Sequence, residues 1–224
     1  MAVHIVASGS AGLQLAIGLK LIPYVKARIE EWESKSKNIN ILVTGKTGVG
    51  KSTLVNGIVG REVAKQGDSL DPETCEVTAH TTREGDITVN VFDSPGLQDG
   101  TKNEAKYLAD MKQKCADADL VVYCMRMSET RVPEGGPDMK AIKLLNETFG
   151  HDMWKNTVFL LTFANDVVEL AKLKAYDDPE KQQKYFDKQL QSWEALIRER
   201  LRTTVEVPND IVKKNDYNPS WPQK

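Results

Sequence analysis

The chain has 224 residues and a formal net charge of −2 at pH 7. This length suits one α/β domain with a short extension, and the near-neutral charge argues against an electrostatic nucleic-acid binder. Hydrophobic residues make up 40% of the chain and charged residues 28%, which is typical of a soluble globular protein. The three cysteines form no CxxC pair. They argue against a disulfide framework or a zinc site and favour a reducing, cytoplasmic location.

Residues 1–36 are predicted to form an N-terminal amphipathic helix. The stretch 3–19 carries no Lys, Arg, Asp or Glu, but it is too polar for a membrane span and lacks the basic start of a signal peptide. Apolar side chains then recur every three or four residues, which indicates one helical face: Leu15, Leu19, Ile22, Val25, Ile29 and Trp32. We expect this face to pack on the main domain or on a partner helix. The alternative is peripheral contact with a membrane surface through residues 13–33.

From residue 37 onward, predicted strands alternate with predicted helices. Apolar runs indicate strands at 39–44, 118–125 and 156–163, alternating residues indicate strands at 76–84 and 86–93, and a weak last strand is expected at 204–208. Helical periodicity marks 51–59, 103–115, 139–149 and 186–201. Strands 76–84 and 86–93 are expected to form a hairpin. The remaining alternation predicts an α/β domain over 37–212, with a mainly parallel sheet and helices on both faces, and an irregular tail over 213–224.

The most specific motif is "GKTGVGKST", which follows the apolar run "INILVT". Gly45, Gly50, Lys51 and Ser52 satisfy the pattern GxxxxGK[ST]. Glycines let backbone N–H groups approach phosphate, the lysine places its charge at the β- and γ-phosphates, and the Ser hydroxyl is a Mg²⁺ ligand. The helix that starts there adds its dipole. We therefore predict a phosphate loop with Mg²⁺, whose nucleotide contacts are Thr47, Gly48, Val49, Gly50, Lys51, Ser52 and Thr53.

A second motif, "DSPGL", ends the strand 86–93. Asp93 is predicted to hold Mg²⁺ through water, opposite Ser52. Gly96 follows at DxxG spacing, where a glycine N–H can contact the γ-phosphate and report its presence. Ras-type GTPases place a water-orienting Gln directly after this glycine, whereas this chain has Leu97. We therefore expect slow intrinsic hydrolysis, with Leu97 packed as a hydrophobic residue.

Base recognition is predicted from the end of the strand 156–163. Guanine-specific proteins carry NKxD after such a strand, and the corresponding residues here are "FAND". Of that motif, only Asp166 is retained, and its carboxylate could pair with the N1–H and N2–H₂ groups of guanine. Phe163 could lie against the purine face. The alternative is that "FAND" is merely a junction between strand and loop.

These motifs, together with "ADLVVYCMRMSETRV", "NETFG" and "MWKNTVFLLTFAND", resemble the septin-related GTPases. The similarity is greatest to the immunity-associated GTPases (GIMAP type) and to the chloroplast protein-import receptor GTPases (Toc type). It covers roughly residues 36–166 and fades after 170. The resemblance implies a P-loop NTPase G domain that binds GTP or GDP with Mg²⁺. It also accommodates "FAND", because NKxD is often degenerate in this family.

The resemblance implies further site residues. Thr78 matches the polar residue that senses Mg²⁺ and the γ-phosphate, with Thr81 as a competitor. His80 could face the γ-phosphate or a dimer partner, or be a surface histidine. Arg131, in "TRV", matches an arginine that reaches the nucleotide of a partner subunit, and Arg126 is nearby.

A final base contact is expected after the last strand, with Asn209 as the candidate. The predicted function is that of a GTP-binding switch with slow Mg²⁺-dependent GTP hydrolysis, which forms a homodimer through its nucleotide face. A GTP-loaded assembly scaffold with negligible hydrolysis is the alternative. No nucleic-acid partner is expected.

Overall fold

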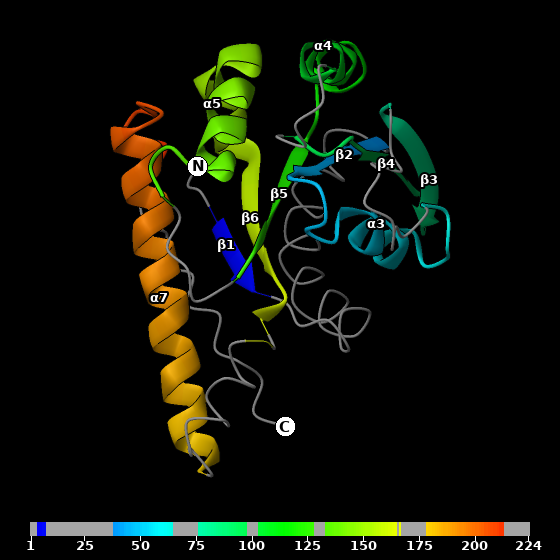
Figure 1. The fold of residues 1–224 in the computed structure, drawn as a ribbon. Helices are drawn as coiled ribbons and strands as arrows, with labels where there is room; N and C mark the ends of the chain where they lie inside the picture. The colour runs from blue at the N-terminus through cyan, green and yellow to red at the C-terminus, as the bar shows by residue number, and fades with distance from the viewer. Residues whose placement is uncertain are drawn as a thin grey trace.

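The computed structural model describes residues 4–7, 38–64, 76–97, 103–127, 133–164, 166 and 178–212. They contain a six-stranded sheet in the order β1-β6-β5-β2-β4-β3 (Figure 1). The pairs β1–β6, β6–β5, β5–β2 and β2–β4 are parallel, and β4–β3 is an antiparallel hairpin. The predicted mainly parallel sheet and its hairpin are thus confirmed. The strands are β1 (His4–Ala7), β2 (Asn38–Gly45), β3 (Thr78–Glu84), β4 (Ile87–Asp93), β5 (Leu120–Arg126) and β6 (Thr157–Thr162).

Helices cover both faces of the sheet, as predicted. Helix α3 (Lys51–Val59) packs on one face, and α4 (Glu104–Cys115), α5 (Pro137–Phe149) and α7 (Pro179–Thr203) pack on the other. A short 3₁₀ helix, η2 (His151–Asn156), leads into β6. Within the described ranges, no helix combines the length and the apolar character that crossing a membrane requires.

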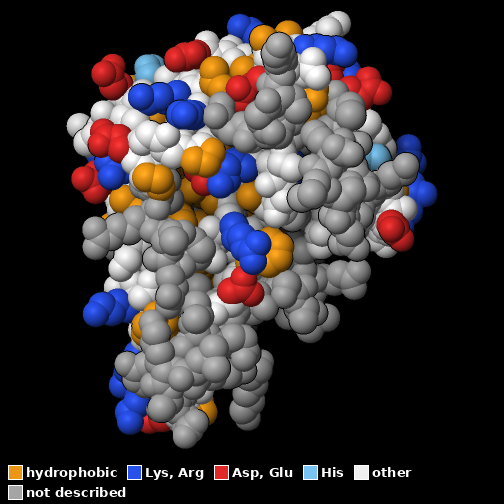
Figure 2. Space-filling model, in the orientation of Figure 1, with side chains coloured by type: hydrophobic (Ala, Val, Ile, Leu, Met, Phe, Trp, Pro, Cys, Tyr) orange, Lys and Arg blue, Asp and Glu red, His pale blue; other side chains and the backbone are white. Residues whose placement is uncertain are grey.

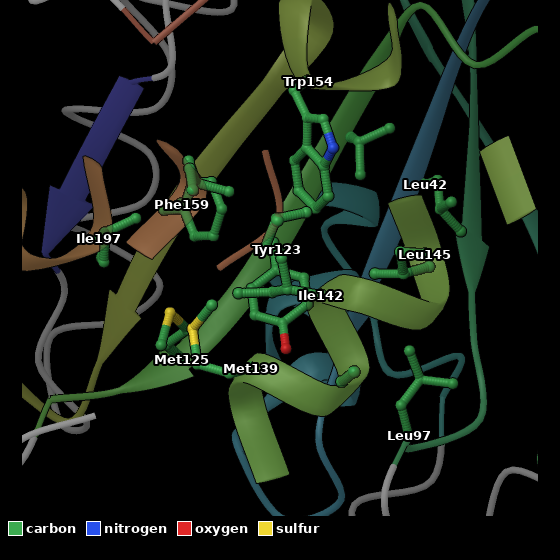
Figure 3. Close-up of a cluster of buried hydrophobic side chains, with 14 of the residues drawn as sticks. Leu42, Leu97, Tyr123, Met125, Met139, Ile142, Leu145, Trp154, Phe159 and Ile197 are labelled. Carbon is green, nitrogen blue, oxygen red and sulfur yellow. The ribbon is translucent and has the colours of Figure 1, made fainter. Parts of the chain in front are cut away.

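The core follows from the burial pattern of the strands. Every residue of β6, and every residue of β5 except the last, is buried, because these strands have packed layers on both sides. Aromatic rings fill the layer beneath α5. Trp154 stacks on Phe159 with ring centroids 6.0 Å apart, and Tyr123 lies tilted against Phe159 at 5.4 Å (Figure 3). This packed aromatic layer holds β5 and β6 in place. Their carboxyl ends, together with that of β2, lie at the same end of the sheet.

The edge of the sheet beside β6 differs from the sequence prediction. The weak strand expected at 204–208 does not form, because Glu206 adopts a φ of +59° and a proline follows two residues later, so that the chain turns. The N-terminal strand β1 pairs with β6 instead, in a register that places Ala7 opposite Leu161. Residues 4–7 therefore belong to the sheet and not to a helical extension. The periodic face of 15–32, the contact region 13–33 and the tail 213–224 lie outside the described residues.

Candidate functional site

The predicted phosphate loop connects β2 to α3. Gly50 adopts a φ of +86° and caps α3, and its carbonyl accepts a hydrogen bond from the Leu54 N–H at 3.1 Å. A left-handed cap of this kind favours glycine. The Lys51 side chain is only 8% exposed, and its ammonium donates to the Lys46 carbonyl at 2.8 Å. The loop thus has the strand–loop–helix context that its motif requires.

The remaining predicted loop contacts fall into two groups. Thr47 and Gly48 are exposed at the tip of the loop, and Ser52 and Thr53 are half-buried at the start of α3. The Val49 side chain is buried in the core beneath α3, which leaves only its backbone to face a ligand.

Asp93 and Ser52 meet as predicted. The Ser52 hydroxyl donates to Oδ2 of Asp93 at 3.1 Å. Asp93 is 1% exposed, and no hydrogen-bond partner from the described residues reaches its Oδ1. Burial raises the pKa of Asp93, and the charge of Lys51 and the Ser52 hydrogen bond offset that rise only in part. A hydroxyl beside a buried carboxylate with spare acceptor capacity fits a hard cation such as Mg²⁺, which typically binds one or two protein oxygens and keeps several waters.

The hairpin register separates Thr78 from its competitor Thr81. Thr78 lies directly opposite Asp93, and residues opposite each other in an antiparallel pair share a face of the sheet. Thr81 lies opposite Asn90 and donates to its side-chain oxygen at 2.9 Å, on the other face. The half-buried His80 shares the Thr78 face, with its Nε2 3.4 Å from the Thr78 hydroxyl. Thr78 is thus the threonine that lies beside the carboxylate.

Gly96 lies against the phosphate loop. The N–H of the next residue, Leu97, donates to the Gly45 carbonyl at 3.1 Å. A Cβ on Gly96 would come within 2.7 Å of the backbone nitrogen of Thr47, so no larger residue fits without a shift. The Leu97 side chain is fully buried among core residues (Figure 3). It packs as a hydrophobic residue, as expected.

Phe163 and Asp166 are brought together by a turn after β6, in which the Asp166 N–H donates to the Phe163 carbonyl at 3.0 Å. Arg126 joins them from the end of β5. Its Nη2 donates to Oδ2 of Asp166 at 3.1 Å, and its Cζ lies 4.4 Å from the centroid of the Phe163 ring. Arg126 therefore contacts both residues that are predicted to bind the base. Arg131 lies outside the described residues.

Asn209 is not part of this cluster. Its neighbours Pro208, Asp210 and Ile211 line a shallow hollow together with His151 and other residues that precede β6. Phe163 follows β6, and a strand of six residues spans about 20 Å. The structure therefore places the neighbours of Asn209 away from Phe163, because the chain after α7 does not add a strand beside β6, where β1 lies. A base contact by Asn209 stays a prediction.

Two ion-pair contacts of the site were missed by sequence reasoning. Lys46, the second residue of the phosphate loop, pairs with Oδ2 of Asp138 at 2.9 Å and so ties the loop to the start of α5. On α4, Asp110 and Lys114 form an ion pair that also binds the backbone of Val77, the residue before Thr78. The Val77 N–H donates to Asp110 at 2.8 Å, and Lys114 donates to the Val77 carbonyl at 2.8 Å. The spacing of four residues between Asp110 and Lys114 indicates an ion pair within a helix. Nothing in the sequence predicts that this pair also binds the backbone of Val77.

Replacing Asp110 should weaken the fold measurably. Asp110→Ala leaves the buried Val77 N–H without its acceptor, which we expect to lower the free energy of unfolding by about 1–3 kcal/mol. Urea denaturation of this variant can be compared with Glu147→Ala, which removes an exposed carboxylate from α5. Equal stability of the two variants would contradict the predicted role of Asp110.

The same contact has a defined pH dependence. Burial raises the pKa of Asp110, but the Val77 N–H and Lys114 outweigh it, so the pKa lies below the ordinary 3.8. A carboxyl group with a lowered pKa stabilises the fold fully above its ordinary pKa, and this contribution is lost as the pH falls through the lowered value. The stability difference between wild type and Asp110→Ala should therefore shrink only below about pH 4.

The described surface shows no field of one sign on the face seen in Figure 2, where basic and acidic side chains are interspersed. A mainly parallel sheet, a phosphate loop between β2 and α3, and a buried carboxylate at the end of β4 define a P-loop G domain.

The chain belongs to the AIG1 family, whose model matches residues 39–195. It is 32% identical over 139 residues to translocase of chloroplast 33 of Arabidopsis thaliana, a match that covers 58% of this chain and 44% of the relative. It is 32% identical over 143 residues to the translocase of chloroplast 34 homolog of Chlamydomonas reinhardtii, covering 58% of this chain and 35% of the relative. The matched region thus spans less than half the length of these relatives.

Solved structures show the same fold. The structure of Arabidopsis thaliana Toc33 in complex with GDP and Mg²⁺ superimposes with a TM-score of 0.63 at 23% identity, covering 89% of this chain and 76% of that one. Toc33 with Mg²⁺ and GMPPNP gives the same TM-score at 21% identity, covering 89% and 76%. A dimerization-deficient arginine-to-alanine mutant of Toc33 also scores 0.63 at 21% identity, covering 91% and 78%.

Proposed function

We propose that the protein is a GTP-binding switch that hydrolyses GTP slowly with the help of Mg²⁺. The observation that carries this proposal is the meeting of Ser52 and Asp93 beside Lys51, with one oxygen of Asp93 buried and without a hydrogen-bond partner among the described residues. Gly96, packed on the phosphate loop, is suited to respond to the γ-phosphate. The Toc33 structures with GDP and GMPPNP support the assignment of a guanine nucleotide. A cytoplasmic location agrees with the buried free thiols of Cys115 and Cys124.

The chain's own residues have distinct roles in this proposal. Lys51 and the N–H groups of residues 47–53 bind the phosphates and stabilise negative charge as it develops on them. Ser52, Asp93 and Thr78 would hold Mg²⁺, which neutralises phosphate charge when bound. Water attacks the γ-phosphate in line with the leaving oxygen. Phe163 lies against the purine, and Asp166 accepts from the guanine edge.

Hydrolysis is expected to be slow because Leu97, which is buried in the core, takes the position directly after Gly96 where Ras-type GTPases have a glutamine. A second subunit could supply the missing catalysis by placing Arg131 at the phosphates, as an arginine finger does. A further solved structure with a TM-score of 0.63 is described with the statement that dimerization is important for the GTPase activity of the chloroplast translocon components atToc33 and psToc159. We therefore propose a homodimer formed through the nucleotide faces.

A dilution series of the GTPase rate tests this proposal. The rate per subunit should rise with protein concentration. Arg131→Ala should lower the rate at high protein concentration at least tenfold, and so remove most of this rise. An arginine finger typically contributes roughly 10³-fold or more. Arg83→Ala, at an exposed position near the β3–β4 turn, is the matched control. A negligible rate at every concentration, with GTP still bound, would contradict the switch and favour the assembly scaffold.

A further inference from the structure

Three side chains meet at the carboxyl ends of β5 and β6. Arg126, the last residue of β5, lies in register with Thr162, the last residue of β6. One side of its guanidinium lies over the Phe163 ring, with Cζ 4.4 Å from the centroid, and its Nη2 pairs with Oδ2 of Asp166 at 3.1 Å. A cation–π contact and a charge-assisted hydrogen bond therefore hold the same guanidinium.

The cluster of Arg126, Phe163 and Asp166 borders the phosphate loop. A Cβ on Gly50 would lie in ordinary contact, 3.7 Å, with Cε2 of Phe163. Phe163 adopts a φ of +55°, which is unfavourable for a bulky side chain. Backbone strain of this kind is found mainly where ligands bind. The position and the strain both indicate that the cluster serves recognition beside the phosphates.

Stability alone does not explain the ion pair. The side chains of Arg126 and Asp166 are 55% and 42% exposed, and exposed ion pairs contribute little to folding. The structure pairs one guanidinium nitrogen with one carboxylate oxygen. An ionised carboxylate has about four acceptor positions, so this contact leaves capacity for further donors.

We propose that Arg126 is a positioning residue for guanine recognition, which holds the Asp166 carboxylate ready for the two adjacent N–H donors of the guanine edge. This inference rests on the proposed function, because it assigns Asp166 to the base. Adenine presents no such pair of donors, so an oriented carboxylate favours guanine. A carboxylate that is fixed before binding loses less conformational freedom when the base arrives.

The test uses Arg126→Gln in the full chain. We expect GTP affinity to fall about three- to tenfold, which corresponds to the ordering of one side chain, and the unfolding temperature to stay unchanged. Affinity for ITP, which lacks the 2-amino group and offers one donor fewer, should fall less. The ratio of GTP to ITP affinity should therefore narrow. Arg126→Lys keeps the charge without the planar fork and should recover part of the loss.

Two controls separate positioning from other effects. Arg83→Gln removes an exposed arginine from β3 and should leave both affinities unchanged. In the Asp166→Asn background, Arg126→Gln should change GTP affinity no further, because the carboxylate that Arg126 positions is gone. These comparisons need only equilibrium titration of each variant with GTP and ITP.

Three results would overturn the inference. The first is an unchanged GTP affinity of Arg126→Gln. The second is an increased GTP affinity, which would mean that the arginine competes with guanine for Asp166. The third is an equal loss of affinity for GTP and for ITP. The proposed function fails separately if the wild-type protein does not prefer GTP to ATP. The two failures can therefore be told apart in the same set of titrations.

Discussion

Lys51→Met should reduce the affinity for GTP by roughly 30-fold or more, since truncating one partner of a buried charge pair costs about 2–5 kcal/mol. The ammonium of Lys51 is almost fully buried and already points back into the phosphate loop, where it donates to Lys46. A bound phosphate would face this charge with little water between them. Methionine has nearly the length and apolar stem of lysine, so the loss of GTP affinity reports the contribution of the charge alone. Titration with a fluorescent guanine nucleotide measures it.

Lys143→Met is the matched control for this variant, because Lys143 is exposed on α5. It should bind GTP as the wild type does. The thermal unfolding of Lys51→Met must also be compared without nucleotide, since the Lys46 carbonyl loses its donor and a modest loss of stability is expected. A Lys51→Met protein that binds GTP within threefold of the wild type would show that the phosphates bind elsewhere.

Deletion of residues 2–7 should lower the stability of the whole domain by about 3 kcal/mol, which corresponds to a fall in Tm of roughly 10 °C. The deletion removes β1, which pairs with four consecutive residues of β6. All six residues of β6 are buried, so the deletion leaves an apolar strand as an unpaired edge. Unpaired edges promote association between chains. Differential scanning calorimetry and light scattering measure the two effects.

The control for this deletion removes six residues from the other end of the chain, 219–224. It matches the loss in length but leaves the strand pairs of the sheet unchanged. If both truncations unfold at the wild-type temperature, β1 does not contribute to the sheet in solution. If only the N-terminal truncation is destabilised, the sheet has six strands and its first strand comes from the start of the chain.

Most of the fold was predictable because its signals are local. The apolar runs of β5 and β6 and the helical spacing in α5 and α7 mark elements whose type each segment determines by itself. The first and last strands were not predictable in this way. Residues 205 and 207 are valines with the alternation of a strand, yet Glu206 and Pro208 turn the chain. Residues 4–7 form a strand only because β6 offers a free edge, which is a property of the assembled sheet.

The contacts of the site likewise fall into those that motifs predict and those that depend on how the elements pack. Motif spacing predicts that Asp93 reaches Ser52, since both follow strands whose carboxyl ends meet at one edge of a parallel sheet. The contact of Arg126 with Asp166 joins residues 40 positions apart and depends on the register of β5 and β6. The hydrogen bonds of Asp110 and Lys114 with the backbone of Val77 depend on how α4 packs beside the start of β3. No motif encodes these contacts, so they became visible only in the structure.

Competition binding shows whether this site binds a guanine nucleotide with Mg²⁺. Fluorescent GDP is displaced from the wild-type protein by GTP or by ATP, with and without Mg²⁺. We expect GTP to displace fluorescent GDP at a concentration at least about 100-fold lower than ATP, since a hydrogen-bonding site rejects a base that lacks its donors. We also expect removal of Mg²⁺ to weaken GTP binding. Equal displacement by ATP and GTP, or binding of GTP that Mg²⁺ leaves unchanged, would contradict it.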